Sequence, residues 1–212
     1  MNKYKIPTNF KEYLDCYLPE LTVRRLFPRK DMEQDSGKIY KKERIINNYM
    51  NISKWEACCI SSGYETSVID KPDRLYTAEK CDAYAQIIAT EDNLLFHGDK
   101  ANYIDGLDKL STKFNGLLKT AVEKYNPSRI VANRTMLKDI KIDTQLDECQ
   151  FVEDGTYYLF PEITPDIAEF VIWQDVYEDP VPFKQRGGTN LYDMYEWVAI
   201  AIHKPEMFIK VR

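Results

Sequence analysis

The sequence predicts an α+β fold, and three observations support this class. Apolar residues recur every three or four positions between residues 74 and 97, which indicates a long helix. A glycine turn at 187–188 leads into alternating apolar and polar residues, which indicates strands at the end of the chain. Between residues 24 and 46, two strand-like runs flank a polar stretch, which indicates an extended hairpin.

Residues 1–23 form the first predicted segment, an N-terminal arm. Its apolar side chains fall at helical spacing and make one stripe, and Pro19 is expected to end or kink that helix. The stripe has two interpretations: a helix that packs on the protein's own core, or an arm that binds a neighbouring subunit, a cargo or a scaffold. The residues of the stripe are Phe10, Tyr13, Leu14 and Tyr17.

Residues 24–46 form the predicted hairpin, here called the extended segment. The strand-like runs are 22–27 and 38–46, and Asp35-Ser36-Gly37 marks a turn in the polar tip. The segment has too few apolar residues for a core of its own, so we expect it to lie on another surface. In an assembling protein that surface is the adjacent subunit. The candidate contact residues are Arg29, Lys30, Asp31, Glu33, Asp35 and Lys38.

The rest of the chain is predicted from its periodicity. The long helix ends before Gly98, as glycine at a helix C-terminus requires. Asn126-Pro127-Ser128 ends a second predicted helix. The expected elements are helices at 74–97, 107–125 and 134–140, and strands at 129–133, 156–161, 168–176, the alternating stretch from 186 and the final residues 208–211.

Two parts of this pattern resemble a known family. A helix with an acidic pair is followed by an apolar trio, a Gly-Asp turn and an Ile-x-Gly-Leu step; the matching residues are Asp92, Phe96, Gly98, Ile104, Gly106 and Leu107. The chain then closes on an acidic-aromatic strand, a Lys204-Pro205-Glu206 corner and a short strand from Phe208. This order resembles shell proteins of the Hong Kong 97 type, which include tailed-phage major capsid proteins and encapsulins. The match covers residues 74–212, whereas residues 1–73 correspond only by position.

The resemblance implies a domain organisation. It comprises an N-terminal arm (1–23), an extended loop hairpin (24–46), a peripheral domain (47–125 and 181–212) with a spine helix (74–97), and an axial domain (126–180). The implied function is self-assembly into an icosahedral shell, as the major capsid protein of a tailed phage or prophage that encloses DNA. The alternative is an encapsulin nanocompartment, in which the stripe holds a cargo enzyme.

The resemblance also implies partners and a location. The chain would bind copies of itself to form pentamers, with hexamers as a further option. Other partners could be a separate scaffold, a portal protein or decoration proteins. A capsid protein would be part of the virion and assemble in the bacterial cytoplasm, and an encapsulin would stay in the cytoplasm.

Composition sets limits on other functions. The net charge is −5 and no basic block occurs, so DNA would be enclosed without sequence-specific binding. The five cysteines form no C-x-x-C pair, and no signal peptide or membrane span is predicted. No phosphate-loop, nucleophile-elbow or zinc-protease motif is found, so we expect no catalytic residue, cofactor or metal site.

A small cytosolic enzyme is the competing hypothesis from another functional class. Its site would lie near His97, Asp99 and Asp105, where a histidine beside carboxylates has the groups needed for acid–base chemistry. However, a histidine at a helix C-terminus also has a structural role, because it complements the helix dipole.

Overall fold

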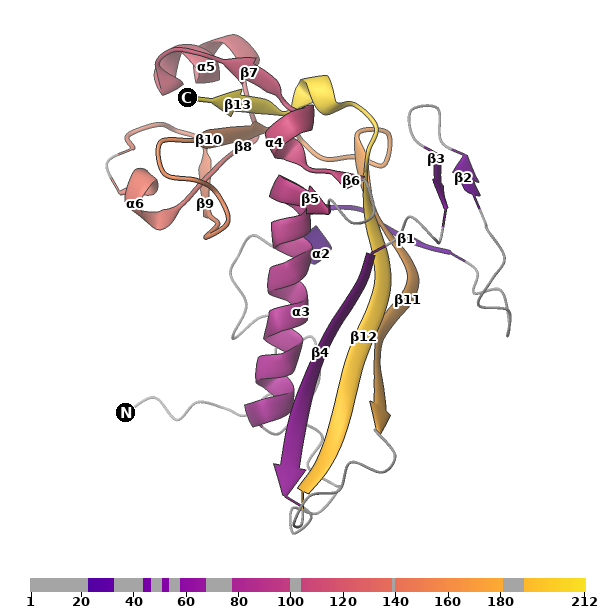
Figure 1. Cartoon of the computed structure of the whole chain (residues 1–212). Coiled ribbons are helices and arrows are strands. Elements are labelled where there is room, and N and C mark those ends of the chain that lie inside the picture. Colours follow the sequence, from indigo (N-terminus) through magenta and orange to yellow (C-terminus); the bar gives the residue numbers. More distant parts are fainter. Residues whose placement is uncertain are drawn as a thin grey trace.

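The computed structural model describes residues 23–32, 44–46, 51–53, 58–67, 78–99, 104–138, 140–180 and 189–212 (Figure 1). Two larger sheets contain most of the strands in these residues. The long sheet has four strands in the order β1-β11-β12-β4, and the small sheet has five in the order β7-β13-β10-β8-β9. With one long helix beside the long sheet, this arrangement confirms the α+β class.

The long sheet forms the lower, elongated part of the molecule in Figure 1. Its strands are β1 (Arg29–Asp31), β4 (Cys58–Ser67), β11 (Ala168–Pro180) and β12 (Thr189–Ile202). β12 pairs antiparallel with β11 and β4, and β1 joins β11 in parallel. Successive residues of β11 are buried on opposite faces: Phe170 and Ile172 belong to the main core, Val171 and Trp173 to a smaller cluster.

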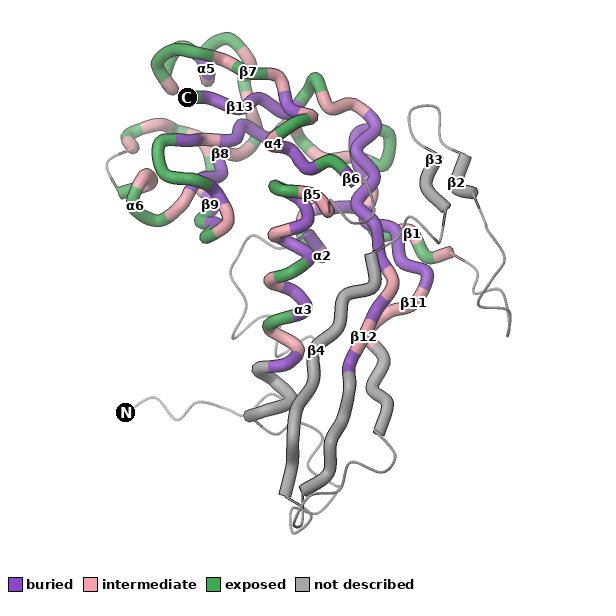
Figure 2. Tube along the Cα trace, in the orientation of Figure 1, coloured by how far each residue is buried: buried purple, intermediate pink, exposed green. Residues whose placement is uncertain are grey.

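The long helix α3 (Ala78–His97) runs beside β4 and β12 and confirms the predicted helix; residues 74–77 lie outside the described residues. Its apolar residues Ile87, Leu95 and Phe96 are almost fully buried in the main core. Figure 2 shows this burial on one side of α3 and exposed residues on the other. Apolar residues recur every three or four positions because these positions form the face of α3 that packs on the sheet, and this spacing predicted the helix.

Two glycines allow the chain to turn sharply after α3. Gly98 has φ +70°, and the short strands β5 (Gly98–Asp99) and β6 (Ile104–Asp105) pair there. A Cβ atom on Gly98 would lie 2.1 Å from the carbonyl oxygen of Ile104, and one on Gly106 would lie 2.4 Å from the nitrogen of Gly98. No side chain fits at either position, which explains physically why both glycines stand in the pattern.

The small sheet forms the upper part of the molecule. Its strands are β7 (Thr112–Phe114), β8 (Arg129–Ala132), β9 (Gln145–Glu148), β10 (Tyr157–Phe160) and β13 (Ile209–Val211). The strands predicted at 129–133, 156–161 and 208–211 are therefore confirmed. Helix α5 (Leu118–Tyr125) packs on this sheet through the buried Ala121. The remaining helices are α4 (Leu107–Leu110), α6 (Arg134–Leu137) and the 3₁₀ helix η2 (Pro205–Met207).

The continuous helix predicted over 107–125 is wrong. The region contains α4, then strand β7, then α5. The backbone N–H of Thr112 donates to the carbonyl of Phe208 (2.8 Å), and β7 continues as a parallel partner of β13. Leu117, the residue just before α5, is 77% exposed. A strand that is distant in sequence therefore overrides the local helical spacing.

The strand predicted at 22–27 is also wrong. Residues Val23–Leu26 form the short helix α2, whose first N–H group, at Val23, donates to the Asp92 carboxylate (2.8 Å). The returning half of the hairpin is described only as β2 (Arg44–Ile46), which pairs with β3 (Asn51–Ser53). A helix held by a buried carboxylate thus stands where the first strand of the hairpin was expected, and residues 33–43 of the predicted hairpin lie outside the described residues.

Each of the two larger sheets takes strands from separate parts of the chain. β11, expected in the axial domain (126–180), belongs to the long sheet, and β13, expected in the peripheral domain (181–212), belongs to the small sheet. The chain thus leaves the small sheet before Ala168 and returns to it at Ile209. Among the described residues, no helix is both long enough and apolar enough to cross a membrane.

Candidate functional site

The described contact residues of the extended segment lie on β1, at one edge of the long sheet. The Arg29 guanidinium binds the carboxylates of Asp31 (2.7 Å) and Asp175 (2.8 Å), and Lys30 Nζ lies 3.3 Å from Glu169. The side chains of Arg29, Lys30 and Asp31 are 47%, 40% and 66% exposed. The other candidates (Glu33, Asp35 and Lys38) and the arm stripe of Phe10, Tyr13, Leu14 and Tyr17 lie outside the described residues.

A buried ionic cluster lies where this segment joins the body of the protein. We call it the Arg24 cluster; it consists of Arg24, Arg29, Glu91, Asp175 and Glu196. Arg24 Nε donates to Glu91 (2.7 Å), Nη1 to Asp175 (2.9 Å) and Nη2 to Glu196. These bonds connect α2 with α3, β11 and β12, so one guanidinium holds four elements together.

The Arg24 cluster contains more carboxylates than guanidinium groups, and burial makes the negative charges of its two glutamates unfavourable. The side chains of Glu91 and Glu196 are fully buried, and one oxygen of each (Glu91 Oε2 and Glu196 Oε1) has no hydrogen-bond partner. Desolvation, and then the charge of Glu196, raise the pKa of Glu91 well above its ordinary value despite the nearby Arg24. Desolvation likewise raises the pKa of Glu196. The cluster therefore favours a protonated carboxyl group in its interior.

The half-exposed Asp175 behaves in the opposite way. Burial would raise its pKa, but the charge and hydrogen bonds of Arg24 outweigh burial and hold that pKa below its ordinary value. Next to the cluster, burial raises the pKa of Asp92 to about 7, although the N–H group of Val23 donates to its carboxylate. The second carboxyl group on the buried face of α3 thus also tends to be neutral.

Sequence reasoning missed the Arg24 cluster, although one signal was visible. Glu91 and Asp92 interrupt the apolar face of a helix whose neighbours Ile87 and Leu95 are buried. Charged residues are rarely fully buried unless they are paired, so an acidic pair on that face predicts a basic partner elsewhere. Which arginine supplies it is not visible locally, because Arg24 lies 67 positions before Glu91.

The predicted enzyme site at His97, Asp99 and Asp105 has a different arrangement. The ring nitrogens of His97 contact the Asp108 carboxylate and the Phe151 carbonyl (2.9 Å), and Asp105 pairs with Lys109. Both ring nitrogens are thus occupied by structural contacts. Within the described residues, no group of three or more His, Cys, Asp or Glu is placed to hold a metal ion.

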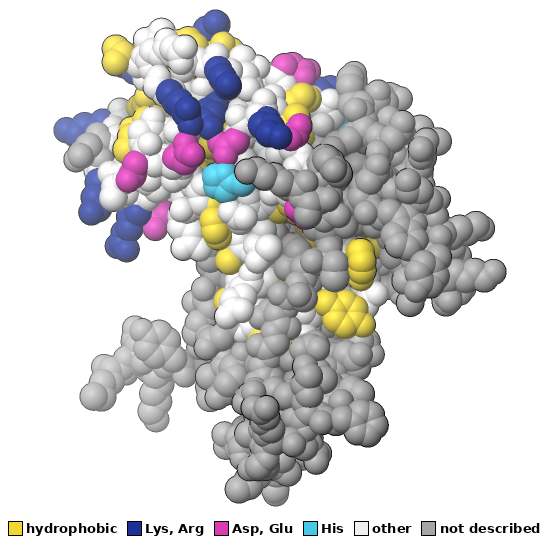
Figure 3. Space-filling model, viewed as in Figure 1, with side chains coloured by type: hydrophobic (Ala, Val, Ile, Leu, Met, Phe, Trp, Pro, Cys, Tyr) yellow, Lys and Arg dark blue, Asp and Glu magenta, His cyan; other side chains and the backbone are white. Residues whose placement is uncertain are grey.

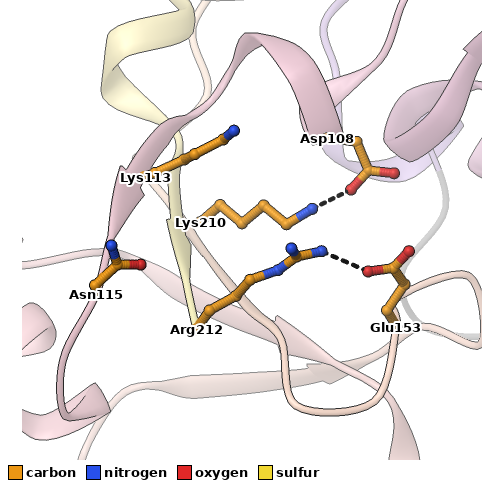
Figure 4. A pocket seen from close by; sticks show the side chains of 6 residues that line it. All are labelled: Asp108, Lys113, Asn115, Glu153, Lys210 and Arg212. Carbon is orange, nitrogen blue, oxygen red and sulfur yellow. Dashed lines mark hydrogen bonds and ion pairs between the residues drawn. The ribbon is translucent and has the colours of Figure 1, made fainter.

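A polar hollow lies close to His97. It has a volume of about 270 Å³ and is lined by Asp108, Lys113, Asn115, Glu153, Lys210 and Arg212 (Figure 4). Lys210 binds Asp108 (2.5 Å), and Arg212 binds Glu153 (2.6 Å). On the face of the molecule in Figure 3, Lys and Arg side chains gather over the upper part, next to several acidic side chains.

Comparison with known proteins finds likeness in the fold and not in the sequence. No family model matches the chain, and no curated protein matches it. A virus-like particle protein from Pyrococcus furiosus is similar in structure, with a TM-score of 0.61 and 12% identity over 91% of this chain and 92% of the other.

Two further solved structures are similar. An encapsulin from Synechococcus elongatus has a TM-score of 0.61 and 10% identity over 89% of this chain and 85% of the other. The structure of the phage G major capsid and decoration proteins has a TM-score of 0.57 and 7% identity over 87% of this chain and 80% of the other. The protein thus has the Hong Kong 97-like fold that the resemblance predicted.

Proposed function

We propose that this chain is a structural protein that assembles into an icosahedral shell, as the major capsid protein of a tailed phage or prophage. The observation that carries the proposal is the extent of the fold likeness, which spans about nine-tenths of both this chain and a virus-like particle protein. A likeness over whole chains favours a shared architecture over one borrowed element. We assign no catalytic role, cofactor or metal to the protein.

Within a shell, we propose separate roles for the two sheets. The long sheet with α3 would form the peripheral domain, and the small sheet would form the axial domain, whose loops meet at fivefold or sixfold positions. The pairing of β13 with β10 supports moving the C-terminal residues 209–211 into the axial domain. In the assembled shell, many modest contacts between subunits would add up, through multivalency, to a closed container.

We propose that the extended segment overlaps a neighbouring copy. Its contact residues would be Arg29, Lys30, Asp31, Glu33, Asp35 and Lys38, and the N-terminal arm would add the stripe of Phe10, Tyr13, Leu14 and Tyr17. The exposed side chains of β1 support this proposal, because part of each stays accessible after its contacts within the chain are made. The Arg24 cluster would fix the direction in which the segment leaves the body.

An encapsulin-type nanocompartment is the second candidate, and the likeness to the Synechococcus elongatus encapsulin favours it. The two candidates differ in content and partners. A capsid would enclose DNA without sequence-specific binding and use portal, scaffold or decoration proteins in a virion. A nanocompartment would stay in the cytoplasm and enclose an enzyme held by the arm.

Expression of the full chain in a bacterial cytosol tests the proposal. We expect closed particles of megadalton mass in light scattering and negative-stain microscopy. Nuclease-protected DNA inside particles from the native source would identify a capsid, and a co-purified enzyme would identify a nanocompartment. A chain that stays a monomer or dimer, both alone and together with the proteins encoded beside it, would contradict the shell proposal.

A further inference from the structure

The polar hollow brings two lysines together on neighbouring strands. Lys113 of β7 and Lys210 of β13 are direct partners in the parallel pair, and both side chains reach toward the hollow (Figure 4). Like charges directly opposite each other destabilise a sheet unless a counter-charge lies between them. Lys210 is only 5% exposed, so water screens its charge poorly.

The carboxylates beside the hollow do not balance its positive charge. Asp108 is the counter-ion of Lys210, but it also accepts hydrogen bonds from the hydroxyl of Tyr158 and from His97 Nδ1. The Asp108 carboxylate is therefore divided among three contacts and is not reserved for the Lys210 ammonium.

The remaining groups add to this excess. Glu153 is the partner of Arg212 at the edge of the hollow. Among the residues that the structure describes, neither the Lys113 ammonium nor the Asn115 amide has an ion-pair or hydrogen-bond partner. Three cationic side chains (Lys113, Lys210 and Arg212) therefore share the two carboxylates of Asp108 and Glu153, and an amide that can donate hydrogen bonds lies beside them.

We propose that this hollow is an oxyanion site, in which Lys113, Lys210 and Asn115 bind a carboxylate or phosphate group. Charge-assisted hydrogen bonds from ammonium groups are the interactions that such groups accept most strongly. A hollow of about 270 Å³ suits a group of this size with some water and lies below the usual range for larger ligands, roughly 300–1,000 Å³. The oxyanion is either a free ion or an acidic side chain from another copy of this chain.

Titration with inorganic phosphate tests the site. Full-length protein in phosphate-free buffer is titrated calorimetrically with phosphate and, separately, with chloride at matched ionic strength. We expect saturable phosphate binding that is about tenfold weaker in Lys113→Ala, because one charge-assisted contact is lost. Lys119→Ala is the matched control, since this lysine is 82% exposed and lies outside the hollow. Binding should be unchanged in the control.

Two results of the titration would overturn the proposal. One is the absence of saturable phosphate binding beyond the chloride control in the wild-type protein. The other is an equal loss of binding in Lys113→Ala and Lys119→Ala. Circular dichroism and the unfolding midpoint establish that each variant is folded. We expect Lys113→Ala to fold, because Lys113 is an exposed residue on a short strand.

Particle formation distinguishes the two sources of the oxyanion, and only this part rests on the proposed shell function. If a neighbouring copy supplies a carboxylate, Lys113→Glu lowers the particle yield, Lys119→Glu does not, and phosphate competes with assembly. If the oxyanion is a free ion, both variants assemble equally while phosphate binding still depends on Lys113. If the wild-type chain forms no particles, the shell proposal fails and the phosphate titration still decides the site.

Discussion

The Arg24 cluster and the polar hollow both join distant parts of the chain through charged side chains, but they differ in burial and in the sign of the excess charge. The first has a buried centre of Arg24, Glu91 and Glu196 and contains more carboxylates than cations. The second is partly open and contains more cations than carboxylates. An acidic excess in a closed space is relieved when a carboxyl group takes up a proton, whereas a basic excess at a surface is relieved when an anion binds.

The largest expected effect concerns the extended segment, for which the Arg24 cluster is the attachment point. Deletion of residues 33–37 leaves β1 and the cluster intact. We therefore expect an unchanged unfolding midpoint but no closed particles in light scattering and microscopy. A Gly-Ser stretch of the same length, in place of 33–37, separates the effect of reach from that of charge. Normal particles from the deletion would show that the segment is not an assembly contact.

The second prediction compares how much an ion pair contributes to stability in the Arg24 cluster and in the polar hollow. Arg24→Met leaves Glu91 and Glu196 buried without their cation, so we expect a loss of about 3 kcal/mol in the free energy of unfolding. Arg212→Met in the hollow breaks an ion pair whose side chains are 57% and 55% exposed. That loss should be about 0.5 kcal/mol, because water screens the pair. Denaturant titration at pH 7 measures the free energy of unfolding of both variants. Equal losses in Arg24→Met and Arg212→Met would show that burial does not distinguish the two ion pairs.

Local patterns explain which parts of this comparison the sequence could predict. The helix α3 is encoded by contiguous apolar spacing, and Gly98 and Gly106 by a turn that admits no side chain. These features depend on residues close in sequence. The C-terminal strand β13 was also predicted, from its apolar ends.

The features that escaped prediction depend on partners far along the chain. Val23 begins a helix because the carboxylate of Asp92, 69 positions later, accepts its N–H. β7 is a strand because it pairs with β13, which lies about a hundred positions further along the chain. The Arg24 cluster joins residues up to 172 positions apart. Such pairings exist only after the sheets have formed, so neither periodicity nor composition indicates them.

The third prediction uses the pH dependence of the buried acid. Since the pKa of Asp92 is raised from 3.8 to about 7, its contribution to stability is fully present below pH 4 and is lost as pH rises through 7. Asp92→Asn keeps an acceptor for the Val23 N–H and removes the charge. We expect the variant to be more stable than wild type by roughly 2 kcal/mol at pH 8, with little difference at pH 4.

Denaturant titration at the two pH values measures this effect. The exposed Asp143→Asn makes the same chemical change away from the cluster, so it serves as the control. An Asp92→Asn variant that is less stable than wild type at pH 8 would show that the ionised carboxylate is favourable at that position.

The fourth prediction has the opposite pH dependence and comes from the hollow. Burial would raise the pKa of Asp108, but hydrogen bonds from Lys210, Tyr158 and His97 outweigh burial and hold it below the ordinary value of 3.8. Its contribution to stability is therefore present above pH 4 and is lost as pH falls through its lowered pKa. Because the side chain is 23% exposed, we expect Asp108→Asn to cost only about 1 kcal/mol at pH 7.

Two measurements on Asp108→Asn separate the hollow from the Arg24 cluster. The stability difference from wild type should shrink at pH 2, whereas that of Asp92→Asn grows toward alkaline pH. Removal of a competing carboxylate should also tighten phosphate binding, about threefold. If Asp108→Asn instead stabilised the protein at pH 7 and weakened phosphate binding, the hollow would carry an excess of acid like the Arg24 cluster, and the contrast between the two sites would be lost.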